Sequence, residues 1–316
     1  MAEATCFLPS DTVFLTGPTA SGKSACGIRL AQIIGAEILS LDSMAIYRRM
    51  DIGTAKPTPQ ERALVPHCLI DIVEPSESFS LASYLKAAQT AVAQVHRHGA
   101  RPLFVGGTPL YLKGLLRGIF DGPEADQRFR ALWQEKERQS PGTLHARLRQ
   151  VDPVSAERLH PNDHKRLLRA LEVYEVTGRP ISSLQTQFSQ PAPSGAPLFV
   201  LDWPREVLYN RINRRVDAMI AAGLADEVKS LLAENKPLSK TASAAVGYRE
   251  LIAHFRGEYS LDEAIERIKR ATRNFAKRQM TWCRSFPEAR FIPMNDRSTA
   301  DSTAETIAAI LSAPNA

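Results

Sequence analysis

The feature that most constrains the fold is an eight-residue segment near the N-terminus, Gly17-Pro-Thr-Ala-Ser-Gly-Lys-Ser24. Its spacing is that of a P-loop, in which glycines let the backbone bend into a nest of N–H donors that binds phosphate. The apolar residues 12–16 precede it as a candidate strand, and residues 24–34 follow it as a candidate helix whose N-terminus adds positive charge. The segment therefore predicts a strand, a loop and a helix that together hold a phosphate group.

Every position of this segment is a candidate for phosphate binding. We expect Lys23 to reach the terminal phosphate oxygens, and Ser24 to ligate Mg²⁺ directly or through a water molecule. A P-loop by itself is typical of nucleotide hydrolases and kinases, so ATP is the first ligand that it suggests. The eight candidates are Gly17, Pro18, Thr19, Ala20, Ser21, Gly22, Lys23 and Ser24.

Beyond the P-loop, candidate strands and helices alternate with short turns. Apolar runs at 37–41, 67–71 and 102–106 are typical of strands, and residues 81–98 are typical of a helix. This alternation predicts an α/β fold of the P-loop NTPase type, in which a parallel sheet is covered by helices and ligands gather at the carboxyl ends of the strands. Asp42 and the turn Gly106-Gly107-Thr108 follow two of these runs.

The pattern changes near residue 119, after which charged helical segments run to about residue 180 without a strand. We interpret residues 119–197 as a helical insertion domain, because an apolar strand at 198–201 then rejoins the sheet. Residues 1–118 and 198–316 are predicted to form the catalytic core with basic C-terminal helices. The chain after residue 201 is predicted to be helical, chiefly at 206–222, 224–234 and 261–284.

Composition and charge indicate which partners suit the chain. The net charge is +6, and residues 266–284 alone hold seven basic residues against one acid, Glu266, a surplus that suits a polyanion such as RNA. Four scattered cysteines form no C-x-x-C pair, which argues against a disulfide framework and a zinc site. Because no apolar run approaches the ~18 residues of a membrane span and the N-terminus has no signal-peptide pattern, we expect a cytoplasmic protein. We also expect a monomer, although these features do not bear on it.

Several segments match, in order, those of a known family. Besides the P-loop they are Asp42-Ser-Met with Tyr47, 50–57, Gly106-Gly-Thr108, 169–174, 211–216, 246–249 and 273–282. Together they resemble the tRNA dimethylallyltransferases, also called tRNA isopentenyltransferases, over nearly the whole chain. The strings at 51–57 and 277–279 are the most specific part of this resemblance, because no general physical requirement would produce them.

The resemblance implies a particular reaction. In that family the P-loop holds the diphosphate of dimethylallyl diphosphate, and the acceptor is N6 of adenosine 37, next to the anticodon, in tRNAs that read codons beginning with U. The same transfer is expected here, with release of diphosphate and with Mg²⁺ as cofactor. By resemblance, Asp42 is the general base, Thr108 lines the channel where donor and base meet, and Arg215 stabilises the departing diphosphate.

The resemblance also marks residues that contact tRNA. The insertion contributes Arg130 and residues 165–169, and the core contributes residues 42–45, Thr108 and residues 247–249. Ser243 and Ala244, just before the last stretch, depart from the family's usual residues. The candidate tRNA contacts are Asp42, Ser43, Met44, Ala45, Thr108, Arg130, Lys165, Arg166, Leu167, Leu168, Arg169, Gly247, Tyr248 and Arg249.

Each candidate also has a purely structural interpretation. Asp42 and Thr108 could cap helices, Arg215 could face solvent, and the cations of 266–284 could form an ordinary solvated face. Two other functions stay open on the residues alone, namely a small-molecule kinase and an RNA-binding protein whose P-loop holds phosphate without catalysis. A close variant of the transferase would prenylate free AMP or ATP, although so small an acceptor needs neither the insertion nor the basic helix.

Overall fold

The computed structural model describes residues 8–120, 122–185 and 195–313. The chain divides into two compact units, one spanning Arg117–Gln190 and the other combining Cys6–Leu116 with Pro191–Ala316. We call the first the helical unit and the second the sheet unit. No helix in the described ranges combines the length and the apolar character that a membrane crossing requires.

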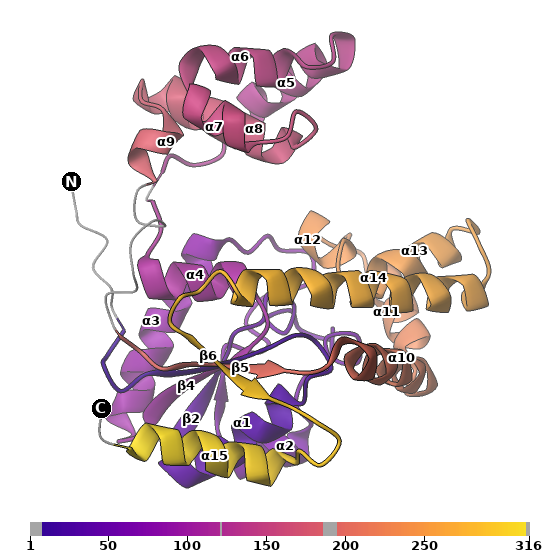
Figure 1. Cartoon of the computed structure of the whole chain (residues 1–316). Coiled ribbons are helices and arrows are strands. Elements are labelled where there is room, and N and C mark those ends of the chain that lie inside the picture. The colour runs from indigo at the N-terminus through magenta and orange to yellow at the C-terminus, as the bar shows by residue number, and fades with distance from the viewer. Residues whose placement is uncertain (1–7, 121, 186–194, 314–316) are drawn as a thin grey trace. The chain divides into compact units, whose positions relative to one another are not determined.

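The sheet unit is built on six parallel strands in the order β3-β2-β4-β1-β5-β6 (Figure 1). The strands are β1 (Val13–Thr16), β2 (Ala36–Ser40), β3 (His67–Cys68), β4 (Arg101–Gly106), β5 (Leu198–Asp202) and β6 (Ala289–Pro293). Every residue of β1 is buried, as expected where helices cover both faces of a parallel sheet. The predicted fold class, a parallel sheet covered by helices, is confirmed.

Successive side chains of β1 pack on opposite faces of the sheet. Val13 and Leu15 join the apolar cluster formed with α1 (Lys23–Ile34) and α15 (Ala300–Ser312), while Phe14 joins the cluster formed with α3 (Leu81–Arg97) and α4 (Pro109–Arg117). Figure 1 shows these two layers on either side of the strands. Thr16, the last residue of β1, pairs with Gly106 of β4, so the P-loop and the Gly106-Gly107-Thr108 turn leave the sheet side by side.

A third apolar cluster anchors the loop that follows β2. Ile46, Tyr47 and Met50 of this loop pack among the C-terminal helices of the sheet unit. Besides α1, α3, α4 and α15, the sheet unit contains α2 (Pro59–Leu64), α10 (Arg205–Ala221), α11 (Leu224–Leu232), α12 (Lys240–Ser243), α13 (Tyr248–Phe255) and α14 (Leu261–Cys283). The loop that follows Asp42, a candidate site residue, is therefore held by a core separate from the two on the faces of the sheet.

The helical unit has its own apolar core, centred on Leu144, Leu148, Leu167 and Leu171. Its helices are α5 (Gln127–Gln139), α6 (Thr143–Val151), α7 (Pro153–Arg158), α8 (His164–Thr177) and α9 (Ile181–Leu184). The bounds 119–197 for an insertion domain remain a prediction, because residues 186–194 lie outside the described residues.

Two strands differ from the sequence-based expectation. The prediction that the chain is helical after residue 201 is wrong at β6, where Arg290 and Phe291 are exposed and Ile292 is buried. A strand at the sheet edge that is mostly exposed and ends in proline carries too weak an apolar pattern to be recognised locally. The strand expected over 67–71 is limited to His67–Cys68, because Leu69 and Asp71 adopt positive φ angles of 64° and 57° that no strand tolerates.

Candidate active site

The P-loop folds as its glycines require. Gly22 caps the N-terminus of α1 with φ of 89°, a conformation in which a side chain would be strained. At Gly17, with φ of 151°, an added Cβ would lie 3.1 Å from Oγ of Ser21 and 3.2 Å from the carbonyl oxygen of Leu201. The loop is therefore tightly bent and packed against β5, and it ends at an exposed helix N-terminus.

Three side chains from distant parts of the sequence hold the P-loop backbone. Oε1 of Gln279 accepts a hydrogen bond from the N–H of Thr19 at 2.9 Å. Nε1 of Trp203 donates to the carbonyl of Ser21 at 2.8 Å, and Nε of Arg211 donates to that of Ala20 at 2.9 Å. The guanidinium of Arg211 also lies 4.3 Å from the centre of the Trp203 ring.

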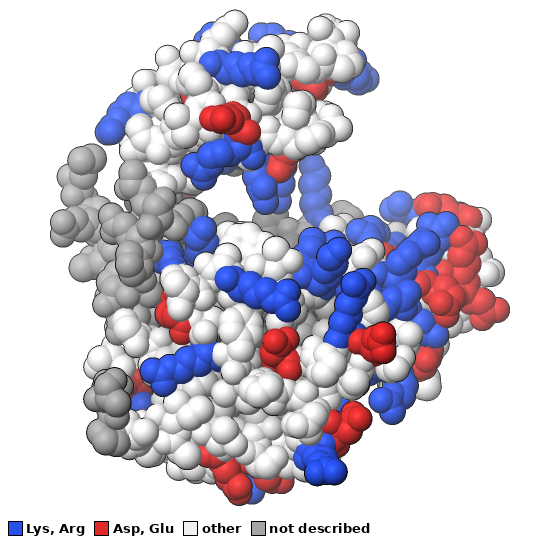
Figure 2. Space-filling model, in the orientation of Figure 1, with Lys and Arg blue, Asp and Glu red and all other residues white. Residues whose placement is uncertain are grey.

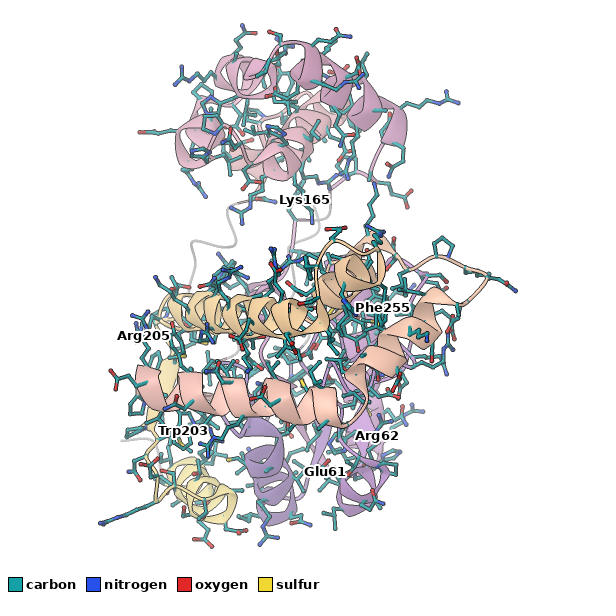
Figure 3. The ribbon with its side chains drawn as sticks, turned by 90° about the vertical axis from the view of Figure 1, so that its right-hand side faces the viewer. Glu61, Arg62, Lys165, Trp203, Arg205 and Phe255 are labelled. Carbon is teal, nitrogen blue, oxygen red and sulfur yellow. The ribbon has the colours of Figure 1, made fainter. Side chains whose placement is uncertain are left out.

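None of these three supporting residues was predicted from the sequence. Trp203 lies between β5 and α10, where Figure 3 labels it beside Arg205. Gln279 belongs to the string 277–279 that made the family resemblance specific, and that specificity was the only available signal for it. No local pattern marks Arg211 as a support of the P-loop, because the carbonyl of Ala20 that it bonds lies 191 residues earlier in the chain.

The candidate site holds more positive than negative charge. Burial, followed by the nearby Arg215, lowers the pKa of Lys23 to about 8, against an opposing effect of Asp42. Burial lowers the pKa of Arg215 as well, and Arg211 adds to this effect while Asp42 opposes it. Within the described residues, neither Lys23 nor Arg215 forms an ion pair. Partly buried cations without a carboxylate partner are the arrangement expected of an anion site.

Asp42 and Thr108 are brought together from two strand ends. Oδ1 of Asp42 accepts hydrogen bonds from the N–H groups of Met44 at 2.8 Å and Ala45 at 3.3 Å. Oγ1 of Thr108 accepts from the N–H of Ser43 at 3.0 Å, and the N–H of Thr108 donates to Leu41 at 3.1 Å. Oδ2 of Asp42 receives no hydrogen bond from any described residue. The carboxylate is thus oriented through one oxygen, and the other is available to a ligand.

The two glycines before Thr108 permit this close approach. An added Cβ on Gly106 would collide with the backbone of Leu41, the residue before Asp42. An added Cβ on Gly107 would lie 2.5 Å from Nε2 of Gln279 and 3.2 Å from the carbonyl oxygen of Gly17. At Gly106 the obstacle is backbone, so only a residue without a side chain fits, whereas a side chain at position 107 would have to displace the amide of Gln279.

Tyr248, a predicted tRNA contact, is fully buried. Its hydroxyl donates to Oε1 of Glu227 at 2.6 Å, and the carboxylate of Glu227 also accepts from the backbone N–H groups of residues 51–53. A Cβ on Gly53 would collide with the Tyr248 ring. The side chain of Tyr248 therefore holds the turn at 51–53, while the neighbouring Arg249 is exposed and pairs with Glu250.

The predicted tRNA contacts of the helical unit fall into two groups. Leu167 and Leu168 are buried in the core of the unit, and Arg130 and Arg169 both pair with the buried Glu172 at 2.8 Å and 2.7 Å. Lys165 and Arg166 lie exposed on α8, and Figure 3 labels Lys165 there. Of these six positions, 165 and 166 thus present the most accessible cations.

The charges of α14 differ between its two halves. In the first half Arg267 pairs with Glu263, and Lys269 pairs with Asp217 at 2.8 Å and Glu266 at 3.0 Å. In the second half Lys277 and Arg278 are exposed, and in the described part of the chain neither forms an ion pair. Figure 2 shows acidic side chains gathered at the α13 end of this helix and basic ones along the rest.

The fold and the site together define a class of protein. A P-loop at the carboxyl edge of a parallel sheet, with surplus cations and one carboxylate beside it, is the arrangement of a P-loop α/β protein that binds a phosphate-bearing ligand. Comparison with known proteins then identifies the family. Residues 45–286 match the family model described as IPP transferase, and residues 11–71 match the model described as Isopentenyl transferase.

Individual relatives agree with these matches. A protein named tRNA dimethylallyltransferase from Syntrophobacter fumaroxidans is 50% identical, over 90% of this chain and 84% of its own length. One of the same name from Symbiobacterium thermophilum is 52% identical, over 86% of each chain. The chain belongs to the IPP transferase family, and the resemblance to tRNA dimethylallyltransferases seen in the sequence is confirmed.

Solved structures give the same result for the fold. The full-length tRNA isopentenylpyrophosphate transferase of Bacillus halodurans is 37% identical with a TM-score of 0.71, and the match covers 95% of each chain. A eukaryotic dimethylallyltransferase, described as acting on tRNA, is 29% identical with a TM-score of 0.77, over 94% of this chain and 77% of that one.

Proposed function

We propose that this protein transfers the dimethylallyl group of dimethylallyl diphosphate to N6 of adenosine 37, next to the anticodon, in tRNAs that read codons beginning with U. The observation that carries the proposal is the surplus of cations at the P-loop directly beside an oriented carboxylate, Asp42. A leaving diphosphate needs the cations, and an acceptor amine needs the carboxylate.

The leaving group is assigned to the P-loop, residues 17–24. Backbone N–H groups and the N-terminus of α1 would bind the diphosphate oxygens, and Lys23 would reach the terminal ones. As the bond between C1 of the donor and the diphosphate oxygen breaks, negative charge grows on that oxygen. Lys23 and Arg215 would stabilise this charge, because neither has a carboxylate partner that competes with the ligand.

The acceptor is assigned to Asp42. Its Oδ1 is fixed by the N–H groups of Met44 and Ala45, and its Oδ2 is free to accept a hydrogen bond from N6 of the adenine. As the new bond between N6 and C1 forms, the amine proton passes to the carboxylate. Thr108 would keep the loop beside Asp42 in place through its bond to the N–H of Ser43.

The residues fit Mg²⁺ bound chiefly through the diphosphate. Among the described residues no group of three or more His, Cys, Asp or Glu side chains could form a protein cage, and the hydroxyl of Ser24 is exposed on the first turn of α1. Mg²⁺ usually keeps several waters and binds through substrate phosphates with one or two protein ligands. When bound, it would supply further positive charge at the leaving group.

The macromolecular partner is assigned to the exposed cations. Lys277 and Arg278 on α14, and Lys165 and Arg166 on α8, would bind the phosphates of the anticodon stem-loop. The target adenine must leave the base stack to reach Asp42, as in other enzymes that modify a base. We propose that the protein acts as a monomer and, because tRNA is its acceptor, in the cytoplasm.

The test is incubation with labelled dimethylallyl diphosphate, Mg²⁺ and either total tRNA or free adenine nucleotides. Label in tRNA, mapped to N6 of the adenine next to the anticodon, is the expected result. Label in AMP or ATP instead would assign the chain to the nucleotide-prenylating variant. Absence of label from both acceptors, together with turnover of ATP, would replace the proposal with kinase chemistry.

A further inference from the structure

Gln279 is a buried polar residue on α14, among side chains that are otherwise apolar where the helix is buried. It lies on α14 between the exposed Arg278 and the core residue Met280, and only 3% of it is exposed. Its Oε1 accepts from the N–H of Thr19 at 2.9 Å, and its Nε2 donates to the carbonyl of Gly107 at 2.6 Å. The N–H of Thr19 needs an acceptor and the carbonyl of Gly107 needs a donor, so the amide fits in only one orientation. Residue 279 must therefore be able both to donate and to accept a hydrogen bond.

The contacts continue on the far side of Gly107. The N–H of Thr108 donates to Leu41, and Oγ1 of Thr108 accepts from the N–H of Ser43 at 3.0 Å. A continuous path of hydrogen bonds and short backbone links therefore runs from the P-loop through Gln279 to the residue that follows Asp42. The two ends of this path are the proposed sites of the leaving group and of the base.

The packing around this bridge leaves little room for adjustment. A Cβ added to Gly107 would lie 2.5 Å from Nε2 of Gln279, 3.2 Å from the carbonyl oxygen of Gly17 and 3.5 Å from Cε of Lys23. The bridge, the first residue of the P-loop and its lysine thus converge on one glycine. A change in the length or polarity of residue 279 is transmitted to both halves of the site.

We propose that Gln279 is a positioning residue for the transfer step, which sets the separation between the P-loop and the Asp42–Thr108 pair. The inference rests on the proposed function, since that function gives the two ends their roles. In a displacement reaction the attacking nitrogen, the carbon and the leaving oxygen must be aligned. A misplacement of ~1 Å costs about 10²-fold in rate.

The first test is Gln279→Met, which keeps the length of the side chain and removes both hydrogen bonds. We expect kcat at saturating donor and tRNA to fall about 10²-fold. The dissociation constants of dimethylallyl diphosphate and of tRNA should change by less than about threefold, because the groups that contact them remain. Thr281→Ala, an exposed position on the same helix, is the matched control and should keep the wild-type kcat.

Two outcomes would overturn the inference. A Met variant with wild-type kcat would show that the bridge is dispensable. A variant with a raised KM for the donor and an unchanged kcat would show that Gln279 only supports the P-loop. Failure of the wild-type protein to label tRNA would refute the proposed function instead, so the two failures are distinguishable.

A second variant, Gln279→Glu, tests the bridge if the Met variant does not fold. A protonated glutamic acid can accept from Thr19 and donate to Gly107 as the amide does, whereas an ionised one can only accept. The ratio of the variant's kcat to that of the wild type should therefore rise as pH falls from about 8 toward 5. A ratio that is constant over this range would contradict the requirement for a donor at this position.

Discussion

The two units of the molecule treat buried charge in opposite ways. In the helical unit the carboxylate of Glu172 is almost fully buried, and it is matched by Arg130, Arg169 and the backbone N–H of Asp126. Burial alone would raise the pKa of Glu172, but the hydrogen bonds from Arg130, Arg169 and the N–H of Asp126 together hold this pKa below its ordinary value. The network is complete without a ligand.

In the P-loop region of the sheet unit, by contrast, the buried cations have no paired carboxylate within the described residues. Lys23 and Arg215 lie near each other, burial lowers the pKa of both, and Asp42 is the carboxylate that opposes this effect. Such a cluster is stabilised when an anion enters. A buried ion pair whose charges are matched thus indicates a structural role, whereas buried cations without a paired carboxylate indicate a binding site.

The largest effect is expected at Asp42, the only carboxylate that we assign to the reaction. Asp42→Asn keeps an oxygen that can accept from Met44 and Ala45 but cannot take up a proton. The rate of transfer should fall on the order of 10³-fold, about 4 kcal/mol, as for loss of a general base. Single-turnover labelling of tRNA measures this rate, and tRNA binding should stay within about threefold. Activity within about tenfold of the wild type would mean that Asp42 is not the base.

Glu172→Gln tests the matched region. Removing the charge leaves two guanidinium groups without their partner, and we expect a loss of about 3 kcal/mol in the stability of the helical unit. Hydrogen exchange of the α8 amides would measure this loss. Because the folded pKa of Glu172 is depressed, its contribution is present above its unfolded pKa and is lost as pH falls through the folded value. The variant should lack this acid-dependent loss; unchanged α8 protection would contradict the structural role.

The pH dependence of donor binding tests whether Lys23 is an unpaired cation of the binding site. Its pKa of about 8 means that the free protein loses this charge above pH 8, while a bound diphosphate would restore it. Donor affinity should therefore be constant below pH 8 and fall by up to about tenfold per pH unit above it. Calorimetric titration with dimethylallyl diphosphate measures the trend. Lys23→Met should bind weakly with no pH dependence in this window, and an equally sloped profile in that variant would exclude Lys23 as the cause.

The smallest effect is expected on α14. The cations named in its first half are paired with carboxylates, whereas Lys277 and Arg278 in its second half are exposed and, within the described residues, unpaired. Lys277→Gln or Arg278→Gln should reduce the slope of log affinity for tRNA against log salt concentration by about 0.7 per lost phosphate contact. Arg267→Gln, which loses a cation already paired with Glu263, is the matched control and should leave the slope unchanged. Equal slopes in all three variants would place the RNA elsewhere.

Much of the fold and part of the site could be predicted from local sequence. The P-loop was predictable because its glycines encode a local backbone shape, and the parallel sheet because apolar runs and helical patterns alternate along the chain. Residue 279 could not be assigned a role in this way, since its partner Thr19 lies 260 positions earlier. Tyr248 and Leu167 were predicted to contact RNA by resemblance, but the packing of their side chains is decided by helices that no local pattern places.

The phosphate-binding loop, the class of fold and the family could all be predicted from the sequence, because they depend on local conformation and on the order of motifs. Which charges are neutralised depends on the folded structure. Arg130 and Lys23 are both basic residues in the sequence, but Arg130 pairs with a buried glutamate, whereas the pKa of Lys23 is lowered by burial and by the charge of Arg215. The reason is physical: the energy of a charge depends on its distance to other charges and on its burial, and folding sets both.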